Sequence, residues 1–419
     1  MSFEHYIYLT VFLLWLLTTV QGVSSFKRGL RFYQYVKRKV AEAKDLRTSS
    51  GEFKYMPKAV IILPCCGVDE KLEQTVAALA RQNYDNYEIV FTFESATDPA
   101  HSAVTQWTKD WEKPRFRLVV AGMAENRGQK IHNLLAALEH IAEDREVLIF
   151  LDSDAIPHEN WLGHLVAPLE DDAVGAATGY RWYVAIGGLA AGMRCAWNAA
   201  TVSLLADEKL NFVWGGSTAI RRDRFDSLKI AERWDRALSD DYQVTRTVRE
   251  AGLKIRFVPQ ALIASSDRTS LRGFLSFARR QVIITKICGF DIWRAGLIIC
   301  LNFLTGSSAV AVLFFFGLFG WFGTTTSMYL ALAGWLVVLV LITGMAALRQ
   351  LGLRMVLKPP ILTWRDALWD IGGTLTFAGS LHLNLVLSSI KTRRFFWRNT
   401  EYEMISPDET RILRRLEPE

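Results

Sequence analysis

The stretch that decides the fold is Val147-Leu148-Ile149-Phe150-Leu151-Asp152-Ser153-Asp154, in which five apolar residues lead directly into two carboxylates. A short, wholly apolar run predicts a strand that is buried on both faces, as in a parallel sheet. Side chains at positions i and i+2 of a strand lie on the same side, so Asp152 and Asp154 are expected to face the same way. Such a pair predicts a site for a hard cation, Mg²⁺ or Mn²⁺. The simpler alternative is a loop whose aspartates only cap neighbouring backbone.

Outward from this strand, apolar runs and helical patterns alternate along the chain. Short apolar runs predict three more strands, at 59–63, 87–93 and 117–121. Apolar residues spaced three and four apart predict helices at 70–82 and 129–143. This alternation predicts an α/β domain over residues 58–290, with a mostly parallel sheet covered by helices on both faces. Ligands bind beyond the carboxyl ends of the strands in such sheets, so polar residues there are the candidate site.

Three further groups of residues fit a nucleotide-sugar site at these strand ends. Glu94 and Asp98 follow the strand at 87–93, where an acidic group can bind ribose or base. Lys130 lies at the start of a predicted helix, whose free N–H groups suit a diphosphate. Gly215 and Gly216 precede another strand and permit close approach of the backbone to a ligand. The simpler alternatives are a basic surface position for Lys130 and a tight turn for the glycines.

A second acidic pair, Asp240-Asp241, opens an apparent helix from Tyr242 to Ala251. Acidic residues are favoured at helix N-termini, so the pair has a structural interpretation. The functional interpretation is a general base for an acceptor hydroxyl. Spacing alone does not choose between the two.

Composition indicates a mixture of soluble and membrane parts. The 419 residues are 50% hydrophobic and 22% charged, and the mean hydropathy is +0.13. The five cysteines form no CxxC pair, which disfavours a disulfide scaffold or a zinc site. Residues 27–58 carry a net +7, so the formal charge of +6 belongs to one stretch beside an apolar segment. Nucleic-acid binding has no supporting motif.

The first 26 residues predict a transmembrane anchor. No charged residue occurs from His5 to Phe26, and about 20 such residues cross a bilayer. Glu4 precedes the run and basic residues follow it, which favours an anchor over a cleaved signal peptide. Residues 27–57 are then a basic juxtamembrane linker on the cytoplasmic side.

A C-terminal membrane region is predicted at 291–390. The absence of charge over the 54 residues from Ala295 to Leu348 predicts two spans, at about 297–320 and 328–348. The segment 361–390 carries Asp366 and Asp370 and is interpreted as an interfacial or re-entrant helix, with a fourth span as the alternative. Residues 391–419 form a cytoplasmic tail. The chain is thus expected to be a multi-pass protein with a cytoplasmic catalytic domain, in a bacterial inner membrane or a eukaryotic internal membrane.

The motifs together resemble the family 2 glycosyltransferases, most closely the membrane-bound ceramide glucosyltransferase-like branch. The similar segments are Val60–Pro64, Ala80–Tyr84, Tyr87–Phe91, Asp98–Ala100, Gly128–Lys130 with Asn133, Asp152–Asp154, Asp240–Tyr242 and Phe396–Tyr402. The resemblance implies a GT-A (Rossmann-like) sheet domain inserted between transmembrane helices. It also implies roles: Asp241 as catalytic base, and Asp154 with Asp152 as ligands of Mg²⁺ or Mn²⁺. The implied nucleotide-sugar-binding residues are Glu94, Asp98, Lys130, Asp152, Gly216, Asp240 and Gln281.

One departure from the family pattern lies before the first C-terminal span. The family has Q/R-x-x-R-W, whereas here Gln281 is followed by Ile284 and Thr285 in place of Arg and Trp. The departure disfavours a processive polysaccharide synthase and weakens the specific assignment to ceramide. Arg279, Arg280 or Lys286 are candidates to supply the missing charge.

The predicted function is inverting transfer of a sugar, with glucose the leading candidate, from a UDP-sugar to a lipid hydroxyl such as that of ceramide. The partners are therefore a UDP-sugar donor and a membrane lipid acceptor, with no nucleic acid. The alternatives are another lipid acceptor, namely diacylglycerol, a polyprenyl phosphate or a hopanoid-type lipid. A non-catalytic nucleotide-binding membrane protein is the alternative from a different class.

Overall fold

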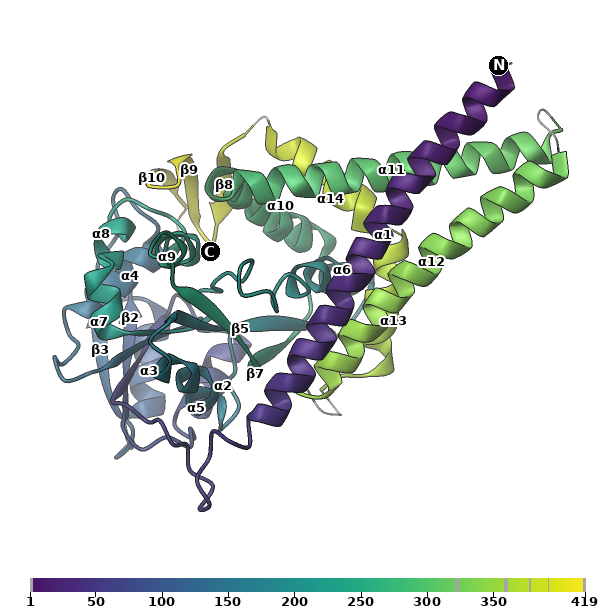
Figure 1. Cartoon of the computed structure of the whole chain (residues 1–419). Helices are drawn as coiled ribbons and strands as arrows, with labels where there is room; N and C mark the ends of the chain where they lie inside the picture. Colours follow the sequence, from purple (N-terminus) through teal and green to yellow (C-terminus); the bar gives the residue numbers. More distant parts are fainter. Residues whose placement is uncertain (1–2, 321–323, 358–360, 377, 391, 417–419) are drawn as a thin grey trace. The chain divides into compact units, whose positions relative to one another are not determined.

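The computed structural model of the chain describes residues 3–320, 324–357, 361–376, 378–390 and 392–416 (Figure 1). The chain divides into two compact units. The helical unit comprises Met1–Tyr35, Val184–Leu204 and Asp267–Thr392. The sheet unit comprises Val36–Tyr183, Leu205–Ser266 and Arg393–Glu419.

The sheet unit is built on a seven-stranded sheet with the order β3-β2-β1-β4-β6-β5-β7. Its strands are β1 (Ala59–Pro64), β2 (Tyr87–Phe93), β3 (Arg115–Val120), β4 (Val147–Leu151), β5 (Val174–Ala185), β6 (Ser217–Arg221) and β7 (Lys254–Asp267). Strand β1 pairs in parallel with β2 and β4, and β2 pairs in parallel with β3. Strand β6 runs antiparallel to β4 and β5. The predicted mostly parallel α/β sheet is confirmed.

Alternation along the buried strands separates two apolar layers. Ile61 of β1 packs into one layer, and its neighbour Ile62 packs into the other. The first layer contains α2 (Glu70–Leu79), α3 (Pro99–Thr108) and α5 (Trp161–Val166). The second contains α4 (Gln129–Leu138), α7 (Arg222–Ser227), α8 (Ile230–Trp234) and α9 (Asp240–Glu250). Helices therefore cover both faces, and the carboxyl ends of β1, β2 and β4 meet at one edge.

A second, three-stranded antiparallel sheet closes the chain and belongs to the sheet unit. It consists of β8 (Arg394–Trp397), β9 (Thr400–Ser406) and β10 (Glu409–Arg415), in the order β10-β9-β8 (Figure 1). Met404 and Tyr402 of its central strand are buried. The segment predicted only as a tail is thus a folded part of the sheet unit.

The helical unit consists of long apolar helices and shorter helices packed beside them. They are α1 (Phe3–Glu42), α6 (Leu189–Val202), α10 (Leu271–Cys288), α11 (Phe290–Leu318), α12 (Thr324–Arg354), α13 (Trp364–Thr376) and α14 (Ala378–Ile390). Helix α1 continues past the predicted anchor to Glu42, so the start of the basic linker is helical. The segment at 361–390 forms two helices, α13 and α14, around residue 377, which lies outside the described residues.

Three of these helices are long and apolar enough to span a membrane. They are His5–Glu42, Phe290–Leu318 and Thr326–Arg354. Small residues let them pack closely: Gly306 of α11 faces Thr18 of α1, and the Thr18 hydroxyl donates a 3.1 Å hydrogen bond to the Asn302 carbonyl. Gly29 of α1 packs against Met345 of α12. The three helices coincide with the anchor and the two spans expected from sequence.

The acidic residues of α13 are buried and paired within the helical unit. Asp370 accepts a 3.0 Å hydrogen bond from Nε of the fully buried Arg349 and a 2.8 Å bond from Gln350. Arg349 also donates to the Ser203 hydroxyl, at 2.9 Å. Asp366 accepts from the Ala185 amide at 3.1 Å. These partners explain how α13 carries two carboxylates at buried positions.

Replacing Asp370 with alanine is expected to destabilise the helical unit by about 3–5 kcal/mol, because it leaves the Arg349 guanidinium buried without its partner. Thermal unfolding of detergent-solubilised protein measures the effect. The double variant Arg349→Met, Asp370→Leu removes both charges and should recover most of the loss. A single variant that unfolds at the wild-type temperature would contradict this account of the pair.

Candidate active site

The candidate site begins where β4 ends. The five residues of β4 are all buried, and the chain then turns through Asp152, Ser153 and Asp154. The amide of Ala155 donates to the carbonyl of Asp152 at 3.1 Å, which closes this turn. Both carboxylates lie at the edge of the sheet where ligands bind in such folds.

Lys130 joins this strand end to the start of α9. Its ammonium lies 2.9 Å from Asp152 Oδ1 and 3.2 Å from Asp240 Oδ2, and it donates to the Gly215 carbonyl at 3.1 Å. Burial by itself lowers the pKa of a lysine, but here Asp152 and Asp240 outweigh it and raise the pKa of Lys130 above its ordinary value. Lys130 therefore stays charged, and the structure brings together four of the predicted site residues: Lys130, Asp152, Asp240 and, beside Asp152, Gly216.

Arg181 of β5 is a site residue that the sequence analysis missed. It is 7% exposed, and its two terminal nitrogens contact the two oxygens of Asp154 at 2.6 and 2.5 Å. It also reaches Asp152 Oδ2 at 3.4 Å, and its guanidinium lies 5.1 Å from the centre of the Trp214 ring. Burial alone raises the pKa of a carboxyl, yet the ion pair with Arg181 holds the pKa of Asp154 well below its usual range. The only signal in the sequence was an arginine within an otherwise apolar strand.

The Asp152–Asp154 pair fits a divalent cation by donor type. Mg²⁺ and Mn²⁺ prefer carboxylate oxygens, and Arg181 already occupies this place as a positive charge. Three carboxylates, Asp152, Asp154 and Asp240, face two cations, Lys130 and Arg181. The cluster therefore retains negative charge that a further cation would neutralise.

Asp240 and Asp241 have different surroundings at the start of α9. Asp240 is buried, and burial raises its pKa to about 6, against the opposing effect of Lys130. Asp241 is half-buried and accepts hydrogen bonds from the Ser239 hydroxyl and from the Tyr242 amide, the latter at 2.8 Å. These bonds fix the orientation of the Asp241 carboxylate.

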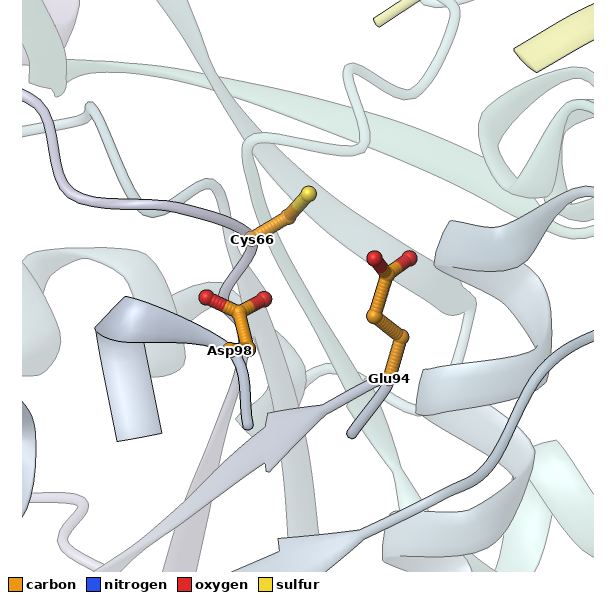
Figure 2. Close-up of side chains that lie close together, drawn as sticks. All are labelled: Cys66, Glu94 and Asp98. Carbon is orange, nitrogen blue, oxygen red and sulfur yellow. The ribbon is translucent and has the colours of Figure 1, made fainter. Parts of the chain in front are cut away.

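Glu94 and Asp98 lie together beyond β2, next to Cys66 (Figure 2). One potential ligand atom from each of the three residues lies within 4.8 Å of the others. Asp98 caps α3 through the Ala100 amide at 2.8 Å and holds the loop after β1 through the Gly67 amide at 2.9 Å. Asp98 therefore has a structural function whatever else it binds.

The glycines at 215 and 216 are required by close contacts within the protein. A methyl group at Gly215 would collide with the Asp240 carboxylate, and one at Gly216 would collide with Asp152 and the Trp214 ring. The sequence analysis expected these glycines to admit a ligand. Their missing Cβ atoms point at side chains of the site, Asp240 and Lys130 for Gly215 and Asp152 and Trp214 for Gly216, and contact with a ligand stays a prediction.

Gln281 lies on α10, in the helical unit, whereas the carboxylate cluster belongs to the sheet unit. Ile284 is buried, and the Thr285 hydroxyl donates to the Gln281 carbonyl at 2.8 Å. Lys286, a candidate for the missing charge, donates to the carbonyls of Ser389 and Ile390 at 2.7 and 3.0 Å. It thereby caps the end of α14.

Comparison with known proteins assigns the family. A family model described as "Glycosyl transferase family 21" matches residues 28–409. The chain belongs to glycosyl transferase family 21. This is the ceramide glucosyltransferase family, so the predicted relationship is confirmed, and the chain is a glycosyltransferase.

Two solved structures are similar to this family 21 glycosyltransferase, to different degrees. A mannosyltransferase from Pyrobaculum calidifontis, solved in complex with GDP-Man and Mn²⁺, is 18% identical with a TM-score of 0.50. That match covers 87% of this chain and 99% of the mannosyltransferase. GalNAc-T7, solved with UDP, GalNAc and Mn²⁺, is 14% identical with a TM-score of 0.38. That match covers 56% of this chain and 51% of the GalNAc-T7 chain. The first likeness supports the predicted GT-A fold.

Replacing Gly216 with alanine should displace the Asp152 carboxylate and the Trp214 ring, because the added methyl group has no room. We expect the unfolding temperature to fall by several degrees, since overpacking costs roughly 1–3 kcal/mol, and transferase activity to fall further. Gly188→Ala is the control: Gly188 also lies outside the helices and strands, its φ is −80°, and nothing lies within 4 Å of its missing Cβ. Equal losses in the two variants would contradict the account of Gly216.

Proposed function

We propose that this glycosyltransferase transfers a sugar, with glucose the leading candidate, from a UDP-sugar to a lipid hydroxyl such as that of ceramide, with inversion at the anomeric carbon. The observation that carries the proposal is the arrangement at the start of α9. Asp241 is a half-buried carboxylate held by two hydrogen bonds, next to the Asp240–Lys130–Asp152 chain of charges. This arrangement therefore has an oriented proton acceptor, Asp241, beside charged groups that suit a diphosphate.

In this proposal the donor lies across the strand ends, with its diphosphate near Lys130 and Arg181. The acceptor oxygen forms its bond to the anomeric carbon on the face opposite the departing UDP. Asp241 takes the proton of the acceptor hydroxyl as that bond forms, and the broken bond leaves its electron pair on the diphosphate. One displacement of this kind inverts the anomeric configuration.

A divalent ion held by Asp154 and Asp152 would neutralise charge on the leaving diphosphate. Arg181 occupies both carboxylates in the structure, so its guanidinium must share or release Asp154 for an ion to bind there. Lys130 keeps Asp152 oriented in either case.

The acceptor class is supported by the family and by the three long apolar helices of the chain. A lipid acceptor confined to a bilayer would be presented to the enzyme in a fixed orientation, which lowers the entropic cost of bringing it to the donor. We place the catalytic domain on the cytoplasmic face, because basic residues 27–58 follow the first apolar segment.

Asp241→Asn is expected to lower the rate of transfer by about 10²–10⁴-fold, because the amide cannot accept the proton. UDP affinity should stay within a few-fold of wild type. Product is measured by mass spectrometry with UDP-glucose and a panel of ceramide, diacylglycerol, polyprenyl phosphate and a hopanoid-type lipid. Asp235→Asn, at an exposed aspartate paired with Arg127, is the matched control and should retain activity. An Asp241 variant that stays active within a few-fold would remove it as base, and transfer only to another lipid would replace ceramide.

Chelation of divalent ions should weaken UDP binding, and Mn²⁺ or Mg²⁺ should restore it, as measured by calorimetry. Asp154→Ala should bind UDP with an affinity that no longer responds to the ion. Asp144→Ala is the control, because Asp144 pairs with Lys58 at the surface. If the Asp154 variant kept the full response to metal, this role would be lost.

A further inference from the structure

The C-terminal sheet touches the loops and helices that carry the site. Its Tyr402 hydroxyl accepts a 3.3 Å hydrogen bond from the Gln129 amide, the first of α4. Its Arg415 donates to the Ala124 carbonyl in the loop before α4. On the α9 side, Asp408 accepts from Gln243 at 3.0 Å and from Arg246 at 3.1 Å. The sheet therefore joins the helix that bears Lys130 to the helix that bears Asp240 and Asp241.

The turn between β8 and β9 carries an arginine in an unfavourable conformation. Trp397 pairs with Thr400, so only Arg398 and Asn399 form the connection. Arg398 has φ = +50°, a left-handed conformation that costs a residue with a Cβ about 1 kcal/mol or more. Glycine is the residue that such a turn favours. An arginine at this position therefore points to a function of its side chain.

The Arg398 side chain reaches the edge of the seven-stranded sheet at which the carboxyl ends of β1, β2 and β4 meet. Its Nη1 donates a 2.6 Å hydrogen bond to the Cys66 carbonyl, in the loop after β1, although the residue as a whole is exposed. Cys66 adjoins Glu94 and Asp98, the residues expected at the nucleoside (Figure 2). Burial raises the pKa of Glu94, as does the charge of Asp98, whereas Arg415 and Arg398 act to lower it.

We propose that Arg398 binds the donor phosphate nearest the nucleoside, which makes the C-terminal sheet part of the donor site. This inference rests on the proposed function. The phosphate nearest the nucleoside links the part of the donor expected at Glu94 and Asp98 to the part expected at Asp154. A planar guanidinium can make two charge-assisted hydrogen bonds to one phosphate, and the exposed Arg398 is held beside that position by Cys66.

The test is equilibrium binding of uridine, UMP and UDP to the full-length Arg398→Gly variant. Glycine relieves the left-handed strain of about 1 kcal/mol, which offsets the lost hydrogen bond to Cys66, so the unfolding temperature without nucleotide should stay close to that of wild type. UMP and UDP should each bind about 10- to 100-fold more weakly, and uridine should bind unchanged. Arg398→Lys keeps the charge without the planar fork and should lose part of the affinity.

Lys229→Gly is the matched control. Lys229 is also an exposed basic residue with a left-handed backbone, at φ = +53°, and it pairs with Glu232 at the surface. This variant should leave all three affinities unchanged.

The possible outcomes separate this inference from the proposed function. Wild-type protein that binds no UDP would overturn both. If wild type binds UDP and Arg398→Gly binds it equally well, only the inference is wrong. Equal weakening of uridine, UMP and UDP would indicate a structural role for Arg398, and weakening of UDP alone would move its contact to the outer phosphate. Either result would overturn the assignment.

Discussion

The candidate site depends on one interaction, the sharing of the Lys130 ammonium between Asp152 and Asp240. The two carboxylates come from the end of β4 and the start of α9, which are nearly 90 residues apart in sequence. Without a cation between them they would repel each other in a poorly solvated place. Lys130 thus fixes the distance between the strand that carries the predicted metal ligands and the helix that carries the predicted base. Glycine is required at 215 and 216 because the backbone there passes in contact with the Asp240 and Asp152 carboxylates.

Arg181 likewise offsets the negative charge of the carboxylates at the end of β4. It lies on β5, which the antiparallel β6 separates from β4. Its bidentate contact keeps Asp154 ionised and oriented. An ion that binds this pair therefore has to compete with an arginine that is already well placed. Because of this competition, the affinity of the site for the ion depends on Arg181 as much as on the two aspartates.

The local sequence pattern was enough to predict the parallel strands of the sheet. The features that it could not predict depend on contacts between residues far apart in the sequence. Strands β1, β2 and β4 were predicted almost to the residue, because their buried apolar runs end at clear breaks, at Pro64, Glu94 and Asp152 respectively. Strand β6 is short and runs antiparallel, which no local pattern reveals. Arg181 could be recognised as part of the site only once β5 was known to lie beside β6. The alternation of polar and apolar residues in β9 is the local pattern of a half-buried strand, so the C-terminal sheet could have been predicted from sequence, whereas its contacts with α4 and α9 could not.

The departure from the family's Arg-Trp pair falls in a different part of the molecule from the carboxylates. Ile284 and Thr285 lie on α10 of the helical unit, whereas Asp152, Asp154, Asp240 and Asp241 all lie in the sheet unit. Ile284 is buried, and the Thr285 hydroxyl donates a hydrogen bond within α10, to the Gln281 carbonyl. Lys286 is engaged with the end of α14, so it fixes the packing of two helices. Under the proposed function, the replacement of the family's Trp by Thr285 is the change expected to affect the binding of the acceptor. The acidic residues proposed to handle the donor are retained, so under the same proposal the choice of lipid is the property in which this enzyme is expected to differ most from its relatives.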